Sequence, residues 1–161
     1  MNAAIKQGHS SLDVARYIIN KCAESGANNS LTPMQVLKLV YIAHGWMLGL
    51  TGRPLICDQV EAWRYGPVIP KLYHAIKGYR SNVVAKVPRS EEVEFDPSEQ
   101  SIMDQVCTIY GPSTGLQLSQ LTHKDGSPWA KTWNSEQRGC VISNDVIEAH
   151  YAKLAQERRS A

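Results

Sequence analysis

The 161-residue sequence predicts a mainly α-helical, α+β fold: a compact bundle of about six to seven helices with a small two- or three-stranded β element. Several segments carry apolar residues at helical spacing, begin with capping residues or proline and end at glycine, whereas only short runs alternate in polarity. The composition, 43% hydrophobic and 20% charged, suits one globular domain with a sizeable core. We therefore expect a single domain over residues 1–161, with an exposed loop at 81–95.

The first helix is expected at residues 10–26. Ser10 lies three residues before Asp13, an arrangement similar to a capping box, and apolar residues then recur at helical spacing until Gly26.

The second helix, residues 32–52, has the strongest boundary signals. Thr32 is placed as the N-cap with Gln35 as its capping-box partner, a proline occupies the first helical position, and Gly52 ends the helix. Its apolar residues cover more than one narrow stripe, which predicts a central helix packed on several sides. Gly45 and Gly49 inside it indicate that another backbone approaches closely.

An aromatic segment follows, "EAWRYGPVIPKLYHAIKGYR" at residues 61–80. The run at 59–65 alternates in polarity, which predicts a short strand ended by Gly66 and Pro67. A helix is then expected from Pro67 or Pro70 through "KLYHAIKGY". The two faces of the strand hold Val60 and Ala62 on one side and Glu61, Trp63 and Tyr65 on the other.

The second half of the chain is expected to contain further helices. Residues 96–111 begin with Asp96 and Glu99 in capping positions, "STGLQLSQLTHKDG" forms a shorter helix, and the helix starting at Ser127 places Trp129 and Trp133 four residues apart. The tail from residue 143 forms a last amphipathic helix with a basic end. Residues 140–143 are expected to pair with the strand at 59–65, and 93–95 to form a short strand.

Charge and motif content exclude several functions. The net charge of +2 creates no global field toward nucleic acid or a membrane surface, and no run approaches the length of a membrane span. Four separated cysteines are interpreted as buried thiols of a cytoplasmic protein. Five histidines lack metal-binding spacing, and phosphate-loop, dinucleotide and nucleophile-elbow motifs are absent. We expect no cofactor and no metal.

A second segment of interest is "LTHKDGSPW", residues 121–129. It is consistent with a helix-loop-helix joint that places Trp129 in the core, and equally with a surface role. One corner can serve both purposes, with its aromatic residues building the joint and its rim remaining accessible.

Three segments, in this order and spacing, resemble the Panacea domain of the SocA-like or GepA-like group of phage- and prophage-associated proteins. They are "LTPMQVLKLVYIAHGWMLGLTGRPL" at 31–55, "EAWRYGPVIPKLYHAIKGY" at 61–79 and "LSQLTHKDGSPW" at 118–129. The resemblance places Leu37, Tyr41 and Leu55 in the core, and Gly52, Gly66 and Pro67 at backbone turns.

The resemblance implies a non-enzymatic antitoxin of a toxin-antitoxin system that neutralises a cognate, adjacently encoded toxin by direct binding. At least one member of the group acts as an adaptor that hands its toxin to a ClpXP-type protease. Polar and aromatic residues on the corners are the candidate partner-binding site: Glu61, Trp63, Arg64, Tyr65, His123 and Trp129.

Two other functions remain open. In a small enzyme or ligand-binding domain, Glu61, Arg64 and His123 would converge in a pocket, with Glu or His as acid-base and Arg as an anion clamp. A transcriptional regulator would need a helix that presents several Arg or Lys outward, and residues 53–71 do not have that pattern.

Overall fold

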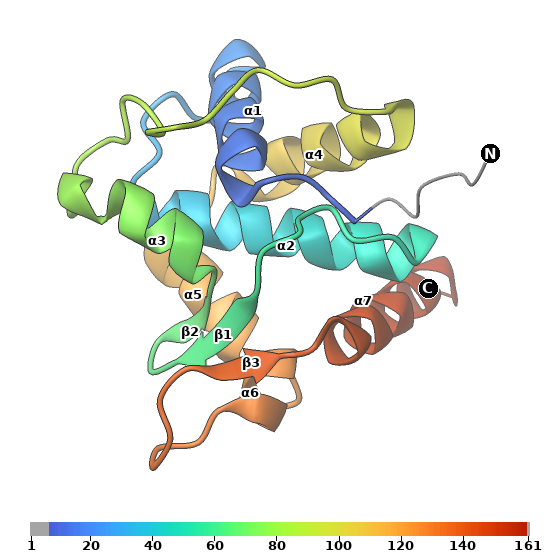
Figure 1. Cartoon of the computed structure of the whole chain (residues 1–161). Coiled ribbons are helices and arrows are strands. Elements are labelled where there is room, and N and C mark those ends of the chain that lie inside the picture. The colour runs from blue at the N-terminus through green and yellow to red at the C-terminus, as the bar shows by residue number, and fades with distance from the viewer. Residues whose placement is uncertain (1–6, 161) are drawn as a thin grey trace.

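A computed structural model describes residues 7–160 and confirms the mainly α-helical fold with a small β element (Figure 1). In chain order, the elements of this part of the chain are α1 (Ser11–Glu24), α2 (Pro33–Thr51), β1 (Val60–Trp63), β2 (Gly66–Val68), α3 (Pro70–Ile76), a 3-10 turn η1 (Lys77–Tyr79), α4 (Pro97–Tyr110), α5 (Gly115–His123), α6 (Pro128–Thr132), β3 (Cys140–Ile142) and α7 (Asn144–Ser160).

Helix α2 is the centre of the fold, as its broad apolar surface predicted. Every residue from Gln35 to Leu48 is buried. In Figure 1, α2 crosses the molecule with α1 and α4 on one side and α7 on the opposite side, near the C-terminal end of α2. It also contacts α3, α5 and β2. Leu37, Tyr41 and Leu55 are core residues, as expected.

Two glycines of α2 allow α7 to pack against it closely. A Cβ atom built on Gly45 would lie 2.2 Å from the ring of Tyr151, and one built on Gly49 would lie 2.7 Å from the backbone carbonyl carbon of the same residue. Both distances are far below van der Waals contact. The close approach that the glycines predicted is therefore made by α7.

Local signals fix most helix starts. Thr32 with Gln35, and Asp96 with Glu99, form reciprocal capping boxes, and proline occupies the first helical position after each cap. Ser10 caps α1 by accepting a hydrogen bond from the Leu12 amide. Asp13 does not complete a box; its carboxylate accepts from the Glu91 amide at 2.7 Å and so ties α1 to the loop before α4.

The three strands form an antiparallel sheet in the order β2-β1-β3. The pairing of β3 with β1 was predicted. The strand expected at 59–65 ends at Trp63, before Gly66 and Pro67, and the chain turns at Arg64 and Tyr65. The helix expected from Pro67 or Pro70 does not begin at Pro67, because Gly66 and Pro67 begin β2. Proline is tolerated there because β2 is an edge strand. The following helix begins at Pro70.

Residues 81–95 contain no helix or strand, so the short strand predicted at 93–95 was wrong. The segment is nevertheless attached to the body of the protein at three apolar points. Val84, Val87 and Phe95 are buried, and the Phe95 ring lies 4.5 Å from that of His9 and 5.2 Å from that of Tyr17. Burial of these side chains replaces strand pairing as the force that holds the segment.

The cysteine prediction holds for two of four residues. Cys22 and Cys107 are buried, Cys140 is half-buried and Cys57 is exposed; all four are free thiols. Within residues 7–160, no helix has both the length and the apolar content to cross a membrane.

Candidate functional site

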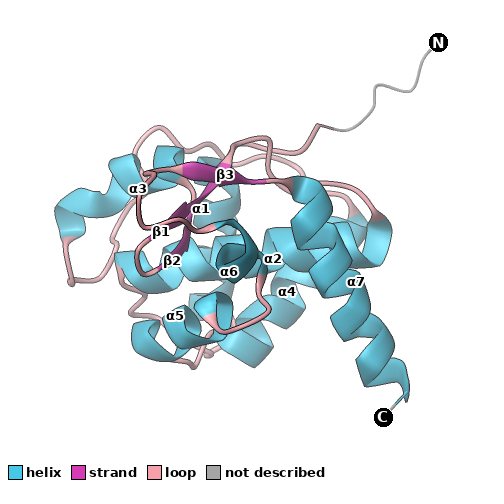
Figure 2. Cartoon of the chain, turned by 90° about the horizontal axis from the view of Figure 1, so that it is seen from below, coloured by secondary structure: helices cyan, strands magenta, loops and turns pink. Residues whose placement is uncertain are grey.

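The aromatic corner, defined by the six predicted residues, is formed by the β1–β2 hairpin and the joint between α5 and α6. Glu61 and Trp63 lie on β1, and Arg64 and Tyr65 form the hairpin turn. His123 ends α5 and Trp129 lies in the first turn of α6. Contacts of α5 with β2, and of α6 with β3, bring these segments together, and they lie side by side in Figures 1 and 2.

Three alternate backbone carbonyl groups of the hairpin accept hydrogen bonds from side chains of three different helices. The Trp129 indole N–H donates to the Trp63 carbonyl, the Ser119 hydroxyl donates to that of Tyr65 at 2.8 Å, and the Lys38 amine donates to that of Pro67 at 2.8 Å. The donors come from α6, α5 and α2. The hairpin is therefore fixed on both sides of its turn, independently of its own strand pairing.

Lys38 is unusual because it is a cation on the buried face of α2. Its side chain is 3% exposed, and this burial lowers the pKa of the amine to about 8. A Cβ atom on Gly66 would lie 2.8 Å from the amine nitrogen and 3.6 Å from the Thr122 hydroxyl oxygen. Gly66, with φ of 124°, thus makes room for the lysine beneath the hairpin.

The outer face of the sheet carries Glu61 and Trp63, as the alternation predicted. The Trp63 indole N–H donates to Glu61 Oε1 at 3.0 Å, and the Trp63 ring meets the Tyr73 ring edge-on at 5.0 Å between centroids. Val60 and Ala62 face the core. Trp63 is therefore half-buried and joined to both the sheet and α3.

A second row of rings lies at the α5–α6 joint. The imidazole of His123 meets Trp129 edge-on at 5.3 Å, and Trp129 stacks on Trp133 at 5.2 Å with an angle of 19° between the rings. His123 Nδ1 donates to the Ser119 carbonyl. Trp129 both builds the joint and contributes to a half-exposed aromatic surface.

The hairpin turn is the most exposed part of the corner. Tyr65 is 65% exposed, and the Arg64 guanidinium lies over its ring at 5.4 Å from the centroid. These two exposed side chains stand on a backbone that is held in place, so binding at the turn would cost little backbone conformational entropy.

The structure does not bring Glu61, Arg64 and His123 together in a pocket. Five cavities of the described part of the chain lie elsewhere, and none is lined by any of the three. Glu61 is engaged by Trp63, Arg64 by Tyr65, and His123 by Ser119. The geometry offers a surface and no shared reaction centre at these residues.

Three residues that support or adjoin the aromatic corner were not predicted. Trp133 could have been included, because its spacing from Trp129 already predicted a shared face. Lys38 had a weaker signal, a single charge within the apolar run "VLKLV". Ser119 had none, since its role depends on a carbonyl 54 residues away.

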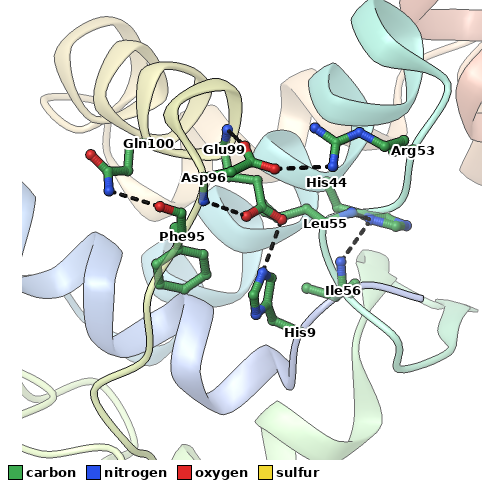
Figure 3. A network of polar contacts seen from close by, with 9 residues as sticks. All are labelled: His9, His44, Arg53, Leu55, Ile56, Phe95, Asp96, Glu99 and Gln100. Atoms are coloured by element: carbon green, nitrogen blue, oxygen red, sulfur yellow. Dashed lines mark hydrogen bonds and ion pairs between the residues drawn. The ribbon is translucent and has the colours of Figure 1, made fainter. Parts of the chain in front are cut away.

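A second polar cluster lies away from the corner, where the N-terminal segment meets α4 (Figure 3). His9 Nε2 pairs with Glu99 Oε2 at 2.9 Å, and the Glu99 side chain is fully buried. Asp96 pairs with Arg53 at 3.0 Å and its amide donates to Glu99. These groups satisfy one another and connect three segments, so the cluster is structural.

His44, also in Figure 3, is fully buried. Its Nδ1 accepts from the amides of Leu55 and Ile56, at 3.2 and 3.3 Å, and its Nε2 donates to Asn144 Oδ1 at 3.0 Å. Burial lowers the pKa of His44 to about 4, and the neutral ring joins α2 to the chain before β1 and to α7.

Comparison with known proteins identifies one family over the part of the chain that contains the aromatic corner. The family model described as "Antitoxin SocA-like, Panacea domain" matches residues 36–130, which include all six predicted site residues. Antitoxin SocA of Caulobacter vibrioides (strain NA1000 / CB15N) is 27% identical over 126 residues, covering 72% of this chain and 66% of that protein. The match thus spans slightly less than two thirds of that relative's length. No solved structure matches the chain.

Proposed function

The chain belongs to the SocA-like Panacea family, and on that premise we propose that it is an antitoxin that neutralises a cognate toxin by binding it directly through the aromatic corner. The partner is a protein, encoded by an adjacent open reading frame, and binding requires no catalytic step by this chain.

The observation that carries the proposal is the fixation of the hairpin by side chains of three helices, with Arg64 and Tyr65 exposed at its turn. Binding energy at protein interfaces concentrates on Tyr, Trp and Arg. A pre-ordered backbone lowers the entropic cost of association, since the turn need not become ordered when the partner docks.

The site supports a binding module better than an enzyme. Catalysis by Glu61, Arg64 and His123 would require these groups to converge, and each is engaged with a different neighbour. The same engagements suit recognition, because they orient the rings and leave the turn accessible.

The test is co-expression with the product of the adjacent open reading frame, followed by co-purification. We expect the native chain to rescue growth and to form a complex. The double variant Arg64→Ala/Tyr65→Ala removes two exposed side chains and should leave the stability nearly unchanged. Loss of about 2 kcal/mol of binding energy would weaken the complex about 30-fold.

The matched control is Val83→Ala/Lys86→Ala, which also truncates one exposed apolar and one exposed basic side chain, on the 81–95 loop. This control should bind like the native chain. If the corner variant is folded and still neutralises the toxin, the site assignment is wrong. If no toxicity and no complex are found with the neighbouring product, the antitoxin proposal itself is refuted.

Two modes of neutralisation differ in one readout. A sequestering antitoxin leaves the toxin intact in a stable complex, whether or not the ClpXP protease is present. An adaptor makes the toxin disappear only in cells that contain the protease. We propose sequestration, because pre-ordered binding at the corner is sufficient for it; loss of neutralisation in a strain without ClpXP would establish the adaptor.

A further inference from the structure

A groove lies at the opposite end of α2 from the residues that hold the hairpin. It is a cavity of about 230 Å³ between the C-terminal turns of α2, α4 and α7, and its lining includes Trp46, Leu50, Ile109 and Arg158. Figure 2 shows the last turns of α7 extending past the helices against which it packs. No residue of the aromatic corner lines this groove.

The lining is mainly apolar, and part of it faces solvent. Leu50 on α2 is 50% exposed and Ile109 on α4 is 55% exposed, although both belong to the same hollow. Single exposed apolar residues are ordinary on protein surfaces. Here two of them, on different helices, border one concave apolar hollow, so their exposed surfaces join into a single apolar area.

Two arginines of the last turn of α7 add positive charge to this apolar hollow. The Arg158 guanidinium lies over the Trp46 ring at 4.7 Å, and its Nη2 donates to the Tyr110 hydroxyl at 3.3 Å. The Trp46 indole N–H donates to the same hydroxyl at 3.2 Å. Arg158 is therefore held in place by neutral groups, and its charge is not cancelled by them.

No carboxylate lines the groove, and within residues 7–160 no ion pair reaches Arg158 or Arg159. Asp104, on the same helix as Ile109, is turned toward α1, where it accepts from the Tyr17 hydroxyl at 2.7 Å. The helix dipole explains why basic residues end α7. It does not explain why an exposed apolar hollow lies beside them.

We propose that this groove binds an acidic amphipathic segment of a protein partner. Apolar side chains of the segment enter the hollow between Leu50 and Ile109, and its carboxylates pair with Arg158 and Arg159. This is the arrangement in which an amphipathic helix binds a groove, with charge complementarity at the rim.

Two alternatives fit the groove less well. Small-molecule sites usually measure about 300 to 1,000 Å³, and this cavity of about 230 Å³ is smaller. Binding of anionic lipid is typical of clusters of roughly four to eight basic residues, whereas this lining holds two. Two apolar side chains of a peptide would fit the volume of this cavity, and an acidic residue beside them would match the charge of the two arginines.

The test uses the full chain and a displayed library of random peptides of about 16 residues, followed by affinity measurement on the recovered peptides. We expect peptides with Asp or Glu beside apolar residues at helical spacing. Arg158→Gln/Arg159→Gln should weaken their binding about tenfold or more, as should Ile109→Ser, which removes an exposed apolar contact without touching the charges. Raising the salt concentration should weaken binding to the native chain.

Matched controls are Lys153→Gln, an exposed charge on the same helix, and Leu116→Ser, an exposed apolar residue of α5. Both should bind the peptides like the native chain, and so should the corner variant Arg64→Ala/Tyr65→Ala. Recovered peptides without acidic residues, or equal binding to folded groove variants, would overturn the proposal. Binding to phosphatidylglycerol vesicles that is lost with the two arginines, in the absence of peptide binding, would assign the groove to a membrane surface instead.

Discussion

Two stacked tryptophans at the α5–α6 joint have different roles. Trp129 donates its indole N–H to the Trp63 carbonyl, whereas the indole N–H of Trp133 makes no hydrogen bond to any described residue. Replacing Trp129 by Phe keeps an aromatic ring but leaves that carbonyl without its donor. We expect Trp129→Phe to lower the free energy of unfolding by about 1 to 2 kcal/mol, and Trp133→Phe by less than about 0.5 kcal/mol, both measured by urea unfolding. Equal effects would show that stacking, and not the hydrogen bond, holds the joint.

The buried His44 makes stability depend on pH in a defined direction. Its pKa of about 4 in the folded protein lies below the ordinary value of 6.5, so the folded state resists protonation. The contribution is fully present above pH 6.5 and is lost as the pH falls toward 4. Its size is up to about 3 kcal/mol. His150, whose pKa burial also lowers, acts in the same direction.

Comparison with the variant His44→Gln isolates this contribution, because His150 and the carboxylates remain in both proteins. Near pH 7.5 the native chain should be more stable than the variant, and the difference should shrink steadily between pH 6.5 and 4. The measurement is urea unfolding at several pH values. A difference independent of pH would mean that His44 is not the titrating group.

At the scale of elements, the contact between α2 and α7 depends on the absence of a side chain at Gly49. Glycine inside a helix usually costs about 1 kcal/mol relative to alanine. Gly49→Ala should nevertheless destabilise, by about 1 to 3 kcal/mol, because its Cβ would lie 2.6 Å from Tyr151 Cβ and 2.8 Å from the Ala152 amide nitrogen.

Gly78 provides the matched control for this change. It also lies in helical backbone, in η1, and a Cβ atom there would meet nothing within 4 Å. Gly78→Ala should therefore be neutral or stabilising by up to about 1 kcal/mol. Thermal unfolding should give a lower midpoint for Gly49→Ala and an unchanged or higher midpoint for Gly78→Ala. A stable Gly49→Ala protein would mean that α7 can move away from α2.

Element boundaries were predictable because the signals that set them are local. Thr32 and Gln35, or Asp96 and Glu99, lie three residues apart, and the geometry of a helix start requires that spacing. The hairpin was predictable only in part. Gly66 and Pro67 are turn residues by composition, and their placement in β2 depends on an edge position in the sheet and on room for Lys38.

The whole molecule was less predictable, because the contacts that assemble its surfaces join distant parts of the chain. His44 meets Asn144 across 100 residues and His9 meets Glu99 across 90. The aromatic corner could be listed from its residue types, but not the three donors that hold its hairpin. The groove of α2, α4 and α7 had no local signal, since it exists only after these helices pack.

At the same scale, α2 connects the two surfaces. Lys38 holds the hairpin, and Trp46, eight residues later, lines the groove, so the two points lie about 12 Å apart along one buried helix. Because α2 is buried on all sides from Gln35 to Leu48, losing its neighbours on either side would expose apolar surface. We therefore expect the corner and the helical body to unfold together as one cooperative unit.

The measurement is urea unfolding followed by tryptophan fluorescence and by far-ultraviolet circular dichroism. Three of the four tryptophans, Trp63, Trp129 and Trp133, report on the corner, whereas the dichroism reports on all helices. Both signals should give the same midpoint and the same dependence on urea concentration. A fluorescence transition at lower urea would show that the corner opens separately. In that case its pre-ordering would be incomplete, and part of the binding energy for a partner would be spent on closing it.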